Sequence, residues 1–167
     1  PIMCVSVAAP NLSDPTLGDR AQFFVEASGS KICRLNESSD TIEPLQRRIR
    51  RMWYHALAVF DERNVEFPVL NAVGCCVFKG RDDKEVSDLP RLYATELCDL
   101  LIVGGFRFRG VLIALPRFDE SDARNYTHFK GVFDERGDKL PMPVMLSSVH
   151  SMIDLADRLA RDNQDVR

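Results

Sequence analysis

The sequence predicts a single α/β domain over residues 1–167, with three layers (α/β/α) around a mainly parallel or mixed central sheet. The apolar segments expected to be strands are continuous rather than alternating, so both of their faces are buried. Segments with helical spacing separate these runs, which is typical of parallel α/β sheets. The chain has 167 residues, 45% of them hydrophobic, which is enough for one core and too little for two.

The first part of the chain contains an expected strand and a long helix. Residues 2–9 are rich in β-formers and small apolar residues and stop at a Pro-Asn turn, which predicts a buried strand. A short apolar patch at 23–25 is a further strand candidate. Asp40 and Glu43 have the spacing of a capping box, and apolar residues then recur at helical spacing. We therefore expect an amphipathic helix over 40–60.

The second part alternates strands and helices. Short apolar runs predict strands over 67–73, 110–115 and 143–146. The first helix expected here is capped by Ser87 or Asp88 and ended by Gly104. A short second helix is capped by Asp122 and carries Tyr126, Phe129 and Phe133. A last helix carries Met152, Ile153, Leu155, Ala156 and Leu159.

Charge and cysteine content exclude several function classes. The net charge of -3 argues against a general electrostatic attraction to nucleic acid or to an anionic membrane. No apolar stretch approaches the roughly 20 residues that cross a bilayer, and the start lacks a signal-peptide pattern. The five cysteines contain no CxxC pair, so neither a disulfide framework nor a metal site is indicated. We expect a cytoplasmic protein without a metal or cofactor.

The loop from Asn71 to Gly80 carries the functional argument. Ligands of parallel α/β sheets bind outside the carboxyl ends of the strands, and this loop follows an expected strand and precedes a helix. Its small residues, two glycines and one phenylalanine allow several backbone N–H groups to point at one anion without a basic cluster. The segment matches neither a Walker loop nor GxGxxG. It predicts a site for a diphosphate.

This loop, Gly74-Cys75-Cys76-Val77-Phe78-Lys79-Gly80, resembles the second ligand loop of the poly(ADP-ribose) glycohydrolase branch of macrodomains. The signature of that loop is Gly-Cys-Gly-hydrophobic-Phe-Gly/Lys-Gly/Asn. The segment Ala8-Ala9-Pro10-Asn11-Leu12 is similar to a strand end of microbial relatives. The run 111–115, followed by Asn125 and Phe129, is similar to the family's next strand and its Asn-containing helix. The likeness spans about residues 2–133.

The resemblance implies a partner and a reaction. The partner is ADP-ribose or an ADP-ribosylated protein, and the reaction is hydrolysis of the ADP-ribosyl linkage. Phe78 would pack against the ribose next to the scissile bond. The residues implied to wrap the diphosphate are Gly74, Cys75, Cys76, Val77, Phe78 and Gly80, and those implied to make further contacts are Asn11, Asn71 and Asn125.

The chain departs from the family at two points. Cys76 stands where the family has its middle glycine, so the backbone there lacks the φ freedom of glycine. The Gly-Gly-Gly then Gln-Glu-Glu segment that supplies the family's catalytic glutamates has no counterpart in these residues. Either the chain is the C-terminal portion of a longer macrodomain, or other carboxylates act. The candidates are Asp82, Asp83, Asp119 and Asp122, which also fit as helix caps or solvated loop residues.

Three alternative interpretations stay open. The chain is a reader that binds ADP-ribosylated partners without turnover, or the loop is an ordinary βα turn of a doubly wound domain that binds some other nucleotide or nothing. A cysteine-dependent hydrolase would use Cys75 or Cys76 as nucleophile, with His128 or His150 as base. Arg47, Arg48, Arg50 and Arg51 form the one basic cluster of the sequence, which is a solvated helix face or a patch for a partner.

Overall fold

The structure is a computed structural model that describes residues 5–10, 24–26, 33–35, 39–73, 89–115 and 120–148. The elements in chain order are β1 (Phe24–Glu26), β2 (Cys33–Leu35), α2 (Ser39–Glu62), β3 (Val69–Asn71), α3 (Leu89–Val103), β4 (Val111–Ala114), α4 (Glu120–Arg136), the 3-10 turn η2 (Gly137–Lys139) and β5 (Val144–Ser147).

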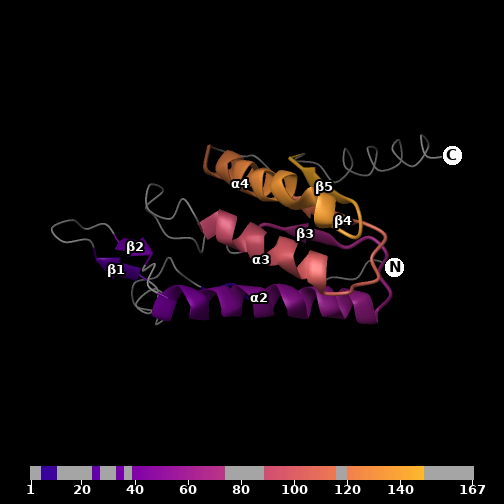
Figure 1. Cartoon of the computed structure of the whole chain (residues 1–167), viewed down its shortest axis with the longest axis horizontal. Coiled ribbons are helices and arrows are strands. Elements are labelled where there is room, and N and C mark those ends of the chain that lie inside the picture. Colours follow the sequence, from indigo (N-terminus) through magenta and orange to yellow (C-terminus); the bar gives the residue numbers. More distant parts are fainter. Residues whose placement is uncertain are drawn as a thin grey trace.

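The central sheet is parallel, as the sequence predicts. Its strand order is β3-β4-β5, and both strand pairs are parallel. The helices α3 and α4 form the two crossovers between these strands, while α2 precedes β3. The three helices lie side by side, and contacts between α2 and α3 and between α3 and α4 join them into one layer (Figure 1). The strands β1 and β2 form a separate antiparallel pair.

The described elements thus establish an α/β fold with one helical layer on a parallel sheet. The second helical layer of the predicted three-layer arrangement is not among the described residues. No helix in this part of the chain is long and apolar enough to cross a membrane.

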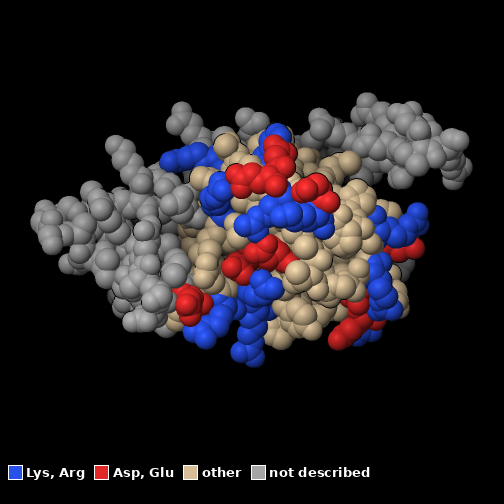
Figure 2. Space-filling view, viewed as in Figure 1, with Lys and Arg blue, Asp and Glu red and all other residues tan. Residues whose placement is uncertain are grey.

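Ion pairs connect the helices on the outer side of their layer. Acidic and basic side chains are interspersed there rather than separated by sign (Figure 2). Arg50 of α2 donates to Glu96 of α3 at 3.3 Å. Helix α4 is held to α3 by Arg136, which pairs with an aspartate of α3, and by Glu135, which accepts from Arg91 at 3.0 Å. The pKa of Glu96 is raised because burial disfavours its ionised form, although its arginine partner opposes the shift.

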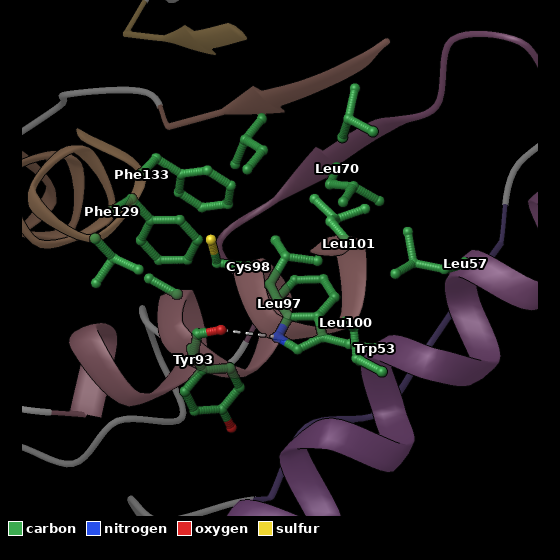
Figure 3. Close-up of a cluster of buried hydrophobic side chains, with 14 of the residues drawn as sticks. Trp53, Leu57, Leu70, Tyr93, Leu97, Cys98, Leu100, Leu101, Phe129 and Phe133 are labelled. Atoms are coloured by element: carbon green, nitrogen blue, oxygen red, sulfur yellow. Dashed lines mark hydrogen bonds between the residues drawn. The ribbon is translucent and has the colours of Figure 1, made fainter. Parts of the chain in front are cut away.

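The core lies between the helical layer and the sheet (Figure 3). Trp53 of α2 is only 1% exposed, and its Nε1–H donates to the Tyr93 carbonyl oxygen of α3 at 3.1 Å. Leu70 of β3 and Ile113 of β4 face the same cluster from the sheet, and Phe129 joins it from α4. Apolar residues at helical spacing therefore converge from α2, α3 and α4 on one face of the sheet.

Hydrogen bonds between Arg107 and Asp61 connect two segments at the amino end of the sheet. Arg107, in the loop before β4, donates its backbone N–H to Asp61 Oδ1 at 2.8 Å and its Nη2–H to the Asp61 carbonyl at 2.7 Å. The hydrogen bond from the Arg107 backbone N–H lowers the pKa of the Asp61 carboxyl below its usual value, and the Arg107 guanidinium lowers it further. Phe106 stacks on Phe108 in the same loop, with ring centroids 5.3 Å apart. The loop is thus tied to the end of α2.

Most predicted elements are confirmed. The helix expected over 40–60 is α2, and the helix expected to end at Gly104 is α3. The strands expected over 110–115 and 143–146 are β4 and β5. The patch expected at 23–25 overlaps β1.

Other predicted bounds are wrong. Strand β3 covers only 69–71 of the predicted 67–73; Pro68 cannot donate a ladder hydrogen bond, although its carbonyl accepts one from Leu112. Residues 5–10 are not in a strand, because the described residues provide no hydrogen-bonded strand next to them; alternate side chains of this segment still pack on the core. Asp122 is not a cap, since α4 is 17 residues long and begins at Glu120, an acidic residue favoured in a first turn.

Candidate functional site

The carboxyl ends of the three parallel strands lie in one row. The strand register pairs Asn71, the last residue of β3, with Ala114 of β4, and pairs Ala114 with Ser147 of β5. Leu115 extends this register by donating its N–H to the Ser147 carbonyl at 2.7 Å. The edge at which α/β proteins bind ligands therefore consists here of small or polar residues.

The chain leaves β3 at this edge through a tight turn. The Val73 N–H donates to the Asn71 carbonyl at 2.9 Å, and the Asn71 side chain is exposed. The predicted diphosphate loop, Gly74 to Gly80, follows this turn directly and lies outside the described residues. Its starting point is therefore fixed at the row of strand ends, while its own conformation is not described.

Helix α4 brings a second polar side chain to this region. The helix begins six residues after β4 ends, and Asn125 lies in its second turn. Asn125 is 5% exposed and Ser147 is 2% exposed, and they belong to the few buried polar residues among those described. A buried amide side chain orients reliably only where hydrogen-bonding groups surround it. Asn125 is thus buried in the fold, whereas Asn71 is open to solvent.

The remaining predicted site residues are distributed as follows. Most of them lie outside the described residues: the loop residues Gly74, Cys75, Cys76, Val77, Phe78 and Gly80, and also Asn11, Asp82, Asp83 and Asp119. Asp122 lies in the first turn of α4, so its backbone is at the carboxyl edge of the sheet. The predicted residues that the structure describes are thus Asn71 at the end of β3, and Asp122 and Asn125 near the start of α4, the helix that follows β4.

Ser147 begins the segment 147–151, which the sequence predicts to lie at the carboxyl end of a strand, where ligands of such sheets bind, but the sequence assigns this serine no contact of its own. The strand register adds that Ser147 lies beside Ala114.

The one cysteine whose side chain is described is unsuited to nucleophilic catalysis. Cys98 is buried in α3, and burial raises the pKa of its thiol to about 11. Cys75 and Cys76 lie outside the described residues, and so does His150. Within the described ranges, no group of three His, Cys, Asp or Glu side chains gathers as a metal site requires.

The arginine cluster has two different environments. Arg47, Arg48 and Arg51 are exposed on α2, as expected for a solvated helix face. Arg51 donates to His55 Nε2 one turn further along at 3.4 Å. Arg50 is half-buried and pairs with Glu96, so part of this cluster joins helices rather than meeting solvent.

Comparison of the chain with protein-family models, with curated proteins and with solved structures gave no match.

Proposed function

We propose that this chain binds ADP-ribose, free or attached to a protein, at the carboxyl edge of β3, β4 and β5. The observation that carries the proposal is the aligned row of Asn71, Ala114 and Ser147, from which the glycine-containing loop departs. Small side chains in this row leave room for a ligand to approach the backbone of that loop. A diphosphate held by backbone N–H groups requires no basic cluster, which agrees with the acidic net charge.

The polar side chains at this edge suit the sugar and base of the same ligand. The exposed Asn71 amide offers both a donor and an acceptor next to the start of the loop. Asn125 lies in the second turn of α4, near the helix end whose free N–H groups and dipole favour anions. The loop residue Phe78 would complete the site as an apolar surface for the ribose. The fold proposed for this assembly is that of a macrodomain.

Hydrolysis of the ADP-ribosyl linkage is the second part of the proposal. The loop anchors the diphosphate, Phe78 positions the ribose, and a carboxylate activates water or protonates the leaving group. Asp122 is the one candidate acid whose backbone is described, and it lies in the first turn of α4 at this edge. A reader without turnover would share the binding site and lack only the last step.

Calorimetry with ADP-ribose and with adenosine tests the binding step. ADP-ribose should bind in the micromolar range and adenosine much more weakly, because the loop contributes much of the free energy of binding. Gly74→Val should abolish binding, since a branched side chain blocks the approach of the phosphate. Gly131→Val is a matched control, because a Cβ at Gly131 meets no atom within 4 Å. Equal binding of both ligands, or tight ADP-ribose binding by folded Gly74→Val, would refute the proposal.

A second variant separates anchoring from positioning. Phe78→Ala should weaken ADP-ribose binding by about 1 to 2 kcal/mol, the order expected for a lost aromatic contact. If the chain is a hydrolase, release of ADP-ribose from a modified protein should fall further than the affinity does, because positioning matters most in the transition state. Asparagine variants of the four candidate aspartates then identify the acid. Binding without any release of ADP-ribose would identify a reader.

A further inference from the structure

Helix α2 forms one end of the helical layer. Within the described part of the chain it packs on α3, and its opposite side is not covered by a neighbouring helix (Figure 1). The side chains of Arg47, Arg51, Tyr54 and His55 are all exposed on this outer side. At about 1.5 Å per residue, the stretch from Arg47 to His55 is about 12 Å long.

The arginines on the outer side of α2 lack the partners that other arginines have. Arginines elsewhere in the described ranges pair with carboxylates: Arg50 with Glu96, Arg91 with Glu135, Arg107 with Asp61, Arg109 with Glu66 and Arg136 with Asp99. Neither Arg47 nor Arg51 forms an ion pair with a described carboxylate, and Arg51 instead donates to His55 Nε2 at 3.4 Å. This side of α2 therefore keeps positive charge in a protein whose net charge is -3.

Tyr54 adds an aromatic ring of restricted mobility to this positive charge. The ring centroid lies 6.1 Å from that of His55, in an edge-on arrangement, and 6.4 Å from that of Phe106. Since two neighbouring rings already restrict Tyr54, a partner that contacts it would remove little conformational freedom. Arginine and tyrosine are enriched among the residues that contribute most to protein–protein binding. The composition of this side therefore favours a protein as the partner.

Two acidic residues limit the positive stretch at its ends. Glu43, one turn before Arg47, and Glu62, the last residue of α2, are both exposed. A nucleic acid carries a negative charge on every phosphate, so a strand that lay along α2 would be repelled by these two carboxylates. A polypeptide can confine its acidic side chains to the stretch between Glu43 and Glu62. The charge distribution therefore fits a short acidic segment better than a long polyanion.

We propose that the side of α2 formed by Arg47, Arg51 and Tyr54 binds an acidic segment of a partner protein. Each guanidinium group pairs with an aspartate or glutamate of that segment, and its fork of N–H donors matches the two oxygens of a carboxylate. The Tyr54 ring packs on an apolar side chain next to the acidic ones. This surface is separate from the row of strand ends, so the proposal does not rest on the binding of ADP-ribose.

Fluorescence anisotropy of a fluorescein-labelled, glutamate-rich peptide that contains one leucine tests the docking on the full chain. The parent should bind this peptide with a Kd below about 1 mM and should not bind its glutamine-rich counterpart. The affinity should fall as salt is added, because salt screens exposed charges. Arg47→Gln/Arg51→Gln should weaken binding at least about fivefold, since two exposed ion pairs are lost. Tyr54→Ala should weaken it about threefold.

The matched control is Arg63→Gln/Lys139→Gln, which removes the same charge from two exposed positions outside this side of α2 and should keep the parental affinity. Circular dichroism verifies that each variant is folded. Equal losses in the two double variants would overturn the proposal, because net charge and not a local surface would then explain the binding. Lack of peptide binding by the parent would also overturn it. Tighter binding of a single-stranded oligonucleotide of equal charge, lost in Arg47→Gln/Arg51→Gln, would replace it with a nucleic-acid surface.

Discussion

Replacement of Trp53 tests whether α2 and α3 pack as described. The side chain is 1% exposed, lies in the centre of the core and donates to the Tyr93 carbonyl at 3.1 Å. Trp53→Phe removes this hydrogen bond, which contributes about 0.5 to 1.5 kcal/mol. It also removes three heavy atoms from a packed site, which costs about 1 to 2 kcal/mol in transfer and cavity terms. We expect a loss of about 2 to 3 kcal/mol, and about 3 to 5 kcal/mol for Trp53→Ala.

Urea denaturation followed by far-ultraviolet circular dichroism measures this loss without relying on tryptophan emission. The expected change is a large part of a total stability of about 5 to 15 kcal/mol, so the midpoint should move clearly. Tyr54→Phe is the control, because Tyr54 is the adjacent residue on α2 and is 50% exposed. Its effect should stay within about 0.5 kcal/mol. If both variants lose the same small amount, Trp53 does not join the two helices.

Three further predictions concern charge and backbone geometry. Asp61→Asn should lower the melting temperature at pH 7. The deficit should shrink as the pH falls below about 3.8, because the lowered pKa of Asp61 gives stability that is lost on protonation. Glu96→Gln should behave oppositely. The raised pKa of Glu96 means that its contribution to the stability of the fold falls as the pH rises above about 4.5. In the same melting series, the melting temperature of the variant should therefore rise relative to that of the parent towards pH 7. Gly104→Ala should destabilise the fold in urea denaturation, because its Cβ would lie 2.3 Å from the Phe106 ring; an unchanged midpoint would contradict the loop geometry.

The sequence predicts the α/β class and most element positions because its signals are local. Helix α2 has an uninterrupted apolar stripe, and α3 ends where Gly104 and Gly105 follow it, with Gly105 at a φ of +64°. Strand β3 is harder to bound, because Pro68 belongs to the apolar run but cannot join the ladder as a donor. The start of α4 was missed because Glu120 and Asp122 are both acceptable near a helix N-terminus.

The candidate site is less predictable, because it depends on contacts between distant segments. A sequence pattern indicates that Asn71 ends a strand and that Asn125 belongs to the following crossover. It does not give the register that aligns Asn71 with Ala114 and Ser147. Nor does it show that Arg50, one of four clustered arginines, pairs with a buried glutamate on the next helix. Such pairings arise from the three-dimensional order of the elements.

The two ends of the sheet differ in a way that supports the carboxyl edge as the ligand side. At the amino end, the backbone and guanidinium donors of Arg107 are already directed at Asp61, so an anion there would have to displace a carboxylate held by several hydrogen bonds. At the carboxyl end, the strands finish in Asn71, Ala114 and Ser147, whose side chains are too small to block the backbone. A ligand recognised through backbone N–H groups needs this second kind of surface. The hydrogen bonds at the amino end therefore stabilise the fold, which is consistent with the proposal that the opposite edge binds the ligand.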